Sequence, residues 1–94
     1  MARLSDEEIE DRLAGGEWRR EGEEIVRDCK LADFAAAIAW VNRVAEAAEA
    51  ADHHPDILVH GWNKVQLRVT NHSAGGLTDA DFALARTLDA LGER

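Results

Sequence analysis

The strongest hydrophobic pattern in the chain lies in residues 33–51. Apolar side chains recur there at helical spacing, at Phe34, Ile38, Val41, Ala45 and Ala48. Alanine, the best helix former, fills much of the remainder, and Asp33 can cap the first turn. Pro55 disfavours helical geometry at His54, so the helix should end near residues 52–54. The pattern therefore predicts one long helix, and its Trp40, like Trp18 earlier in the chain, is expected in the core.

Alternation of apolar and polar residues predicts strands on both sides of this helix. Residues 64–70 form the clearest one, with Val65, Leu67 and Val69 on one face and Lys64, Gln66, Arg68 and Thr70 on the other. A short strand is expected at residues 57–59. Residues 17–20 and 23–31 are expected to pair around a tight turn at residues 21–22, and Ile25 alternates there with Arg27 and Cys29.

Two shorter helices are predicted near the ends of the sequence. Ser5 and Glu8 form a capping box, and the helix they start should end before the glycines at residues 15–16. Thr78 and Asp81 indicate the start of the last helix. The apolar stripes are Ile9 and Leu13 in the first helix, and Phe82, Ala85, Leu88 and Leu91 in the last.

The order of elements is helix, two strands, helix, two strands, helix. Short connections within each pair of strands favour antiparallel pairing. We expect one two-layer α+β domain of residues 1–94, in which three helices pack on one face of a four-stranded antiparallel sheet. A chain of this length buries a modest core, which makes homo-oligomerisation a plausible source of stability.

Composition narrows the possible functions. The 19 acidic and 11 basic residues give a formal net charge of −8, which argues against nucleic-acid binding, since that needs clustered Lys and Arg. Cys29 is the single cysteine, so the sequence has no intramolecular disulfide and no multi-cysteine zinc motif. No apolar run has the roughly 18–20 residues of a membrane span. The start lacks a signal-peptide pattern, and we expect a cytoplasmic protein without a membrane partner.

All four histidines, His53, His54, His60 and His72, fall in one twenty-residue window. Histidine can both give and take a proton near neutral pH. His53 and His54 stand at the predicted helix exit and His72 follows the predicted 64–70 strand, so these three can share a site. His60, at the end of a short strand, reads as a surface residue.

Zinc is the competing interpretation, because three histidines can hold it with an open fourth position. Adjacent histidines rarely aim both rings at one ion, however, and the useful i, i+4 histidine spacing is absent. Glu49, four residues before His53, could be a further ligand or a carboxylate that orients an imidazole. We therefore favour an acid–base site and expect no metal.

Two segments together carry a family resemblance. The first runs through Glu49, His53, His54 and Pro55, and the second runs from Trp62 along the alternating strand to His72. With the downstream Gly-Gly-Leu-Thr and Asp81, they resemble the signature of the pterin-4a-carbinolamine dehydratases over nearly the whole chain. Asn71 stands where that family commonly has threonine.

The resemblance implies a hydro-lyase. Its reaction dehydrates a 4a-hydroxytetrahydropterin (the 4a-carbinolamine) to quinonoid dihydropterin, as in the recycling of tetrahydrobiopterin after aromatic amino acid hydroxylation. The N5 lone pair expels the C4a hydroxyl, so the leaving oxygen needs a general acid and the N5 proton needs a base. The pterin is the substrate and no cofactor is expected.

The resemblance also implies the roles of individual residues. His53 and His72 would be the catalytic acid–base pair, and His54 would bind and orient the pterin. The remaining candidates for substrate binding are Glu49, Asp52, Thr70, Asn71, Ser73 and Trp62.

Partners follow from the same resemblance. It implies self-association, as a tetramer or a dimer. The alternative function is a protein-interaction module that acts as a dimerisation or regulatory cofactor, because some animal members of the family bind a homeodomain transcription factor. An exposed apolar helix face is the feature such a partner would need.

Overall fold

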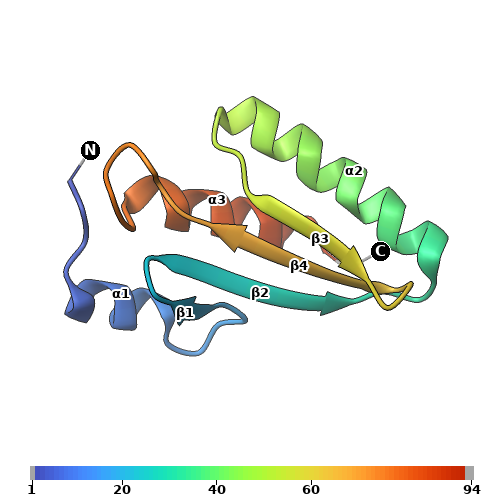
Figure 1. Cartoon of the computed structure of the whole chain (residues 1–94), viewed down its shortest axis with the longest axis horizontal. Coiled ribbons are helices and arrows are strands. Elements are labelled where there is room, and N and C mark those ends of the chain that lie inside the picture. Colours follow the sequence, from blue (N-terminus) through green and yellow to red (C-terminus); the bar gives the residue numbers. More distant parts are fainter. Residues whose placement is uncertain (1, 93–94) are drawn as a thin grey trace.

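A computed structural model describes residues 2–92 of the chain. The elements are α1 (Asp6–Leu13), β1 (Arg19–Glu21), β2 (Glu24–Lys30), α2 (Phe34–Ala51), β3 (Asp56–His60), β4 (Lys64–Val69) and α3 (Asp79–Ala90). The strands form one sheet in the order β1-β2-β4-β3, and every neighbouring pair is antiparallel (Figure 1). The predicted α+β fold and element order are confirmed.

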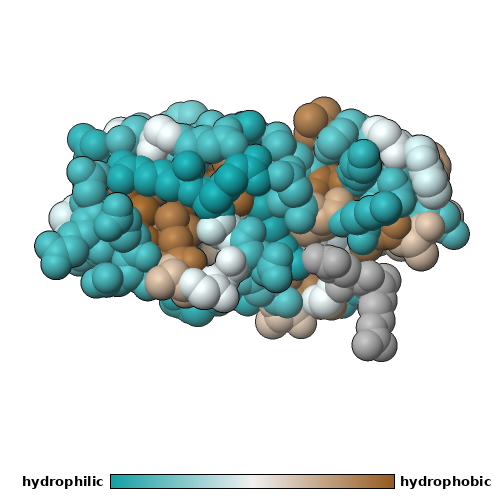
Figure 2. All heavy atoms as spheres, turned by 90° about the horizontal axis from the view of Figure 1, so that it is seen from below, coloured by the Kyte–Doolittle hydropathy of each residue, from teal (hydrophilic) through white to brown (hydrophobic). Residues whose placement is uncertain are grey.

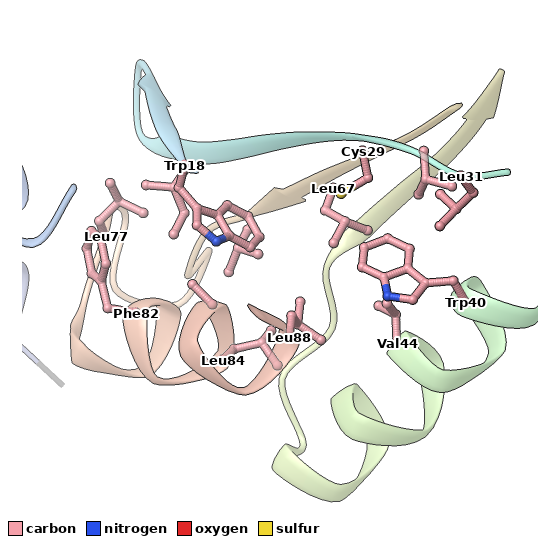
Figure 3. Packing of buried hydrophobic residues seen from close by; sticks show 14 of the residues in the cluster. Trp18, Cys29, Leu31, Trp40, Val44, Leu67, Leu77, Phe82, Leu84 and Leu88 are labelled. Atoms are coloured by element: carbon pink, nitrogen blue, oxygen red, sulfur yellow. The ribbon is translucent and has the colours of Figure 1, made fainter. Parts of the chain in front are cut away.

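The hydrophobic core lies between one face of the sheet and the helices. Figure 3 shows Trp40 and Val44 of α2 and Leu88 of α3 gathered beneath Leu67 of β4. All four side chains are fully buried, as is Ile9 of α1 at 1% exposure. Burying an aliphatic side chain contributes about 1.5–3 kcal/mol, so this interface is the main source of stability.

The predicted inner face of α2 is partly wrong. The stripe expected from spacing included Phe34 and Ile38, yet these are 54% and 37% exposed. The buried residues of α2 are Ala37, Trp40, Val44 and Ala48. Trp40 is buried as predicted, and so is Trp18. An alanine-rich helix offers helical spacing on more than one face, and the face that carries the large indole of Trp40 is the one that fills the core. An apolar strip at Phe34 and Ile38 is left outside.

The first hairpin is shifted from its predicted position. Strand β1 begins at Arg19, because Trp18 turns into the core and its Nε1 donates a hydrogen bond to Asp89 at 2.9 Å. Arg20 pairs with Ile25 and Glu21 with Glu24, which leaves a two-residue turn at residues 22–23. Gly22 supplies the positive φ of 62° that this turn requires.

Arg27 is a charged residue on the inner face of the sheet, and 7% of it is exposed. Its Nη1 donates to Asp89 at 2.7 Å, and its guanidinium lies 5.9 Å from the centre of the Trp40 ring. Asp89 thus accepts hydrogen bonds from both Trp18 and Arg27. This shared carboxylate ties α3 to β2 and to the segment before β1.

The outer face of the sheet is polar. Ion pairs cross it from strand to strand, including Arg19 with Asp28 at 2.6 Å and Arg68 with Glu21 at 3.0 Å. Val26 is fully buried on this face because its cross-strand neighbours are the two arginines, whose apolar stems cover it. Figure 2 shows the molecule from another side, below α1 and β1 in the view of Figure 1, where the surface is mostly hydrophilic and the hydrophobic areas form separate patches. Within residues 2–92, no helix is long and apolar enough to cross a bilayer.

Candidate active site

The end of α2 places the two adjacent histidines. Asp52 adopts a left-handed conformation, with φ 50° and ψ 41°, and its backbone N–H bonds to the carbonyls of Ala48 and Glu49. The backbone N–H of His53 also reaches the Ala48 carbonyl, at 3.2 Å. The chain therefore leaves the helical path just before the histidines, which lets their rings point in different directions.

His53 is paired with a buried carboxylate from α3. Its Nε2 lies 2.6 Å from Oδ1 of Asp81, whose side chain is completely buried. The other oxygen of Asp81 accepts a hydrogen bond from the backbone N–H of Thr78 at 2.8 Å. Because this capping contact fixes the carboxylate, it also fixes the imidazole. A proton held on Nε2 leaves Nδ1 as the ring nitrogen available to a substrate.

His54 has a different kind of partner. Its Nε2 lies 2.6 Å from Oε1 of Glu49, and the two side chains are 57% and 76% exposed. An exposed pair of this sort contributes about 0–1 kcal/mol. The sequence spacing had put Glu49 on the face of His53. The left-handed turn at Asp52 instead brings His54 back to Glu49 and directs His53 toward α3.

A shallow pocket of about 230 Å³ collects most of the predicted site. It is lined by Asp52, His53, His54, Thr70, Asn71, His72 and Ser73. Glu49 reaches it only through His54. The three histidines thus come from the exit of α2 and from the loop after β4, as the sequence predicted.

Trp62 does not line this pocket. It lies in the turn between β3 and β4 and is 61% exposed, whereas the pocket lies beyond the other end of β4. His60 is the last residue of β3 and belongs to the same distant end.

Two predicted binding side chains are occupied by internal contacts. The Thr70 hydroxyl donates to the Glu23 carbonyl at 2.6 Å. The Asn71 side-chain oxygen accepts from the Ala74 backbone N–H at 3.1 Å, and this contact shapes the loop that carries His72.

Asp81 is a site residue that the sequence indicates only as part of a helix start, 28 positions after His53. The available signal was its place three residues after Thr78, because a carboxylate with one oxygen in a capping box has a second oxygen free. Among residues 2–92, no group of three or more His, Cys, Asp or Glu side chains is arranged to hold a metal ion.

Comparisons with known proteins agree with this arrangement. Residues 2–91 match the family model described as pterin 4 alpha carbinolamine dehydratase. A Chloroflexus aurantiacus protein named "Putative pterin-4-alpha-carbinolamine dehydratase" is 53% identical over 97% of this chain and 98% of its own length. An Acidobacterium capsulatum protein of the same name is 48% identical, over 97% and 99%.

Solved structures give the same result. The crystal structure of a transcriptional coactivator/pterin dehydratase from Brucella melitensis superposes with a TM-score of 0.86 at 32% identity, covering 95% of this chain and 97% of that one. A pterin dehydratase-like protein described as a RuBisCO assembly factor of the alpha-carboxysome shares the fold, with a TM-score of 0.67 at 24% identity over 82% and 90%. The chain belongs to the pterin-4-alpha-carbinolamine dehydratase family.

Proposed function

We propose that this chain dehydrates a 4a-hydroxytetrahydropterin to quinonoid dihydropterin and water, in the cytoplasm. The observation that carries the proposal is the pairing of His53 with the buried Asp81, at the edge of a pocket that also contains His54 and His72. Family membership supports the substrate class. The reaction changes no oxidation state, so imidazoles alone can supply its proton transfers.

The chemistry divides between two histidines. The N5 lone pair forms the C4a–N5 double bond while the C4a–O bond breaks, and His72 donates the proton that turns the leaving hydroxyl into water. Nδ1 of His53 then accepts the N5 proton. Asp81, fixed by Thr78, offsets the positive charge that His53 gains in this step. Two rings from different segments can serve two positions on the pterin without moving.

His54 and Asp52 are proposed to hold the substrate. The pyrimidine edge of a pterin carries N–H groups, and a carboxylate such as that of Asp52 can accept hydrogen bonds from them. Among the residues that the structure describes, no lysine or arginine lines this pocket. We therefore expect an uncharged pterin tail to be preferred over a phosphorylated one.

The direct test is the enzyme-dependent rate of 4a-hydroxypterin breakdown, above its spontaneous rate. His53→Ala and His72→Ala should each lower kcat by about 10²- to 10⁴-fold, the usual contribution of a general acid or base. His60→Ala is the matched control, since His60 lies at the other end of β4 and should leave the rate unchanged. Circular dichroism would establish that each variant folds. If the folded His53 and His72 variants keep the wild-type rate, the assignment is wrong.

Association is the second proposal, and the exposed strip on α2 favours it. Phe34 and Ile38 are 54% and 37% exposed and lie one helical turn apart. We propose that a second copy of the chain covers this strip, and that a different protein partner could compete for it. The Brucella relative is described as a transcriptional coactivator/pterin dehydratase, which supports such a use of the fold.

Light scattering after gel filtration tests the strip. Phe34→Glu and Ile38→Glu should shift the mass toward that of a monomer. Ala39→Glu is the control, because Ala39 is an exposed alanine outside the strip on the same helix. A wild-type protein that elutes as a monomer at micromolar concentration would contradict self-association.

A further inference from the structure

The end of β4 opposite the histidine pocket carries a row of basic side chains. Lys30 of β2 is directly opposite Lys64 of β4, and His60 of β3 is opposite Lys64 on its other side. Residues directly opposite in antiparallel strands point to the same face, with Cβ atoms about 4.5–5.5 Å apart. Two ammonium groups and an imidazole therefore stand side by side on the outer face. Lys30 and Lys64 are the only two lysines in the sequence.

This row borders a pocket of about 380 Å³. Its lining comprises Asp28, Cys29, Lys30, His60, Lys64 and Gln66. The pocket is larger than the one at the histidine site, which measures about 230 Å³. Its volume falls within the range of roughly 300–1,000 Å³ that holds small molecules.

Among the described residues, the acidic side chain beside this basic row is already engaged by other partners. Asp28 is the one acidic residue in the lining, and it is bonded to Arg19 Nη1 at 2.6 Å and to Gln66 Nε2 at 3.0 Å. These hydrogen bonds, with Arg19 first, hold the pKa of Asp28 below its usual range, and the nearby His60 lowers it further. Within the described part of the chain, neither lysine nor His60 has a carboxylate at ion-pair distance.

Such an arrangement is unfavourable for the protein alone, since like charges directly opposite each other destabilise a sheet. Two other basic side chains of the outer face do have acidic partners, since Arg19 and Arg68 each form ion pairs with two carboxylates.

We propose that this pocket, here called the lysine pocket, is a second binding site that takes a small molecule carrying a phosphate group. The phosphate would lie between Lys30 and Lys64, with His60 and the Gln66 amide as further donors. Two ammonium groups suit a doubly charged oxyanion better than a single carboxylate. The rest of the pocket volume would hold the organic part of the ligand. This site is independent of the proposed dehydratase reaction.

Titration of the ¹⁵N-labelled full-length chain with sodium pyrophosphate tests the site, with ionic strength held constant by sodium chloride. Saturable shifts should appear at Lys30, His60 and Lys64. Lys64→Gln and Lys30→Gln should each weaken binding by about tenfold, equivalent to about 1.4 kcal/mol, and the double variant should abolish it.

Two further variants separate a built site from general attraction. Arg86→Gln removes the same charge from an exposed position on α3 and should leave the affinity unchanged. Asp28→Asn removes the one carboxylate of the lysine pocket and should strengthen binding several-fold, a gain that misfolding cannot produce. Equal weakening in Arg86→Gln and Lys64→Gln, or shifts spread over the surface without saturation, would overturn the proposal.

Discussion

The two ends of strand β4 present histidines in opposite electrostatic surroundings. Beyond Val69, His53 and His54 each lie 2.6 Å from a carboxylate oxygen. Beside Lys64, His60 has a lysine directly opposite it and no ion-paired acid among the residues described. We propose that the first end moves protons on an uncharged substrate and that the second attracts an anion. The neighbours of a histidine, more than the histidine itself, decide what it can do.

The largest effect is expected from Asp81. Asp81→Asn keeps an oxygen for the Thr78 backbone N–H but can donate its amide to Nε2 of His53, which reverses the ring tautomer. We expect kcat to fall by about 10²- to 10⁴-fold, with little change in KM. Asp81→Ala should also lose about 1 kcal/mol of unfolding free energy through the lost cap.

Steady-state kinetics and urea unfolding measure these two losses separately. Asp79→Asn is the control, because Asp79 lies in the same first turn of α3 but is exposed and paired with Arg12. An Asp81→Asn protein that is fully active would show that the buried carboxylate serves the fold alone.

A smaller effect is expected at the exposed pair of the same pocket. Glu49→Gln removes the charge beside His54 where both side chains are more than half exposed to water. An exposed ion pair contributes about 0–1 kcal/mol, so kcat/KM should change by no more than about fivefold. Activity measurements on this variant would sharpen the contrast between buried and exposed partners. If Glu49→Gln loses as much activity as Asp81→Asn, the contrast between the buried and the exposed carboxylate is wrong.

The smallest effect concerns stability at the lysine end. The pKa of Asp28 is lowered by its bonds to Arg19 and Gln66, so its ionised form is favoured in the folded state. This contribution is fully present above the ordinary pKa of an aspartate and is lost as pH falls through the lowered value. Because the pair is half exposed, solvent screening limits it to about 0–1 kcal/mol.

Urea unfolding from pH 6 to pH 2 checks this linkage. Wild type should be slightly more stable than Asp28→Asn near pH 6, and the difference should disappear in acid. A difference that grows on acidification would have the wrong sign for a lowered pKa.

The sequence predicted the fold and most of one pocket because both depend on local patterns. Strand alternation and capping residues set the element order, and the histidine spacing around Pro55 and β4 brought His53, His54 and His72 together. Local spacing failed at Glu49, where the prediction assumed a helix continuing to His53. The left-handed backbone of Asp52 ends the helix before His53, so the Glu49 carboxylate pairs with His54 instead.

Features that depend on strand register or on how the layers pack could not be predicted from the sequence. Lys30 and Lys64 are 34 positions apart in numbering and meet only because β2 and β4 pair with one particular offset. The choice between two apolar faces of α2 likewise depended on what the sheet could accommodate beneath Trp40. Both are properties of the assembled layers and not of any segment.

The two contacts of Asp81 bear on how catalytic members of this family can be told from members that have lost catalysis. One of its oxygens closes the first turn of α3 and the other holds His53. A descendant that had given up catalysis and kept only a role in binding another protein would still need that helix to start correctly, so it would have reason to keep the aspartate. The aspartate is therefore a poor marker of an active enzyme. The side chains of His53 and His72 are not needed to cap a helix. Their loss in a family member would therefore indicate that catalysis has been lost.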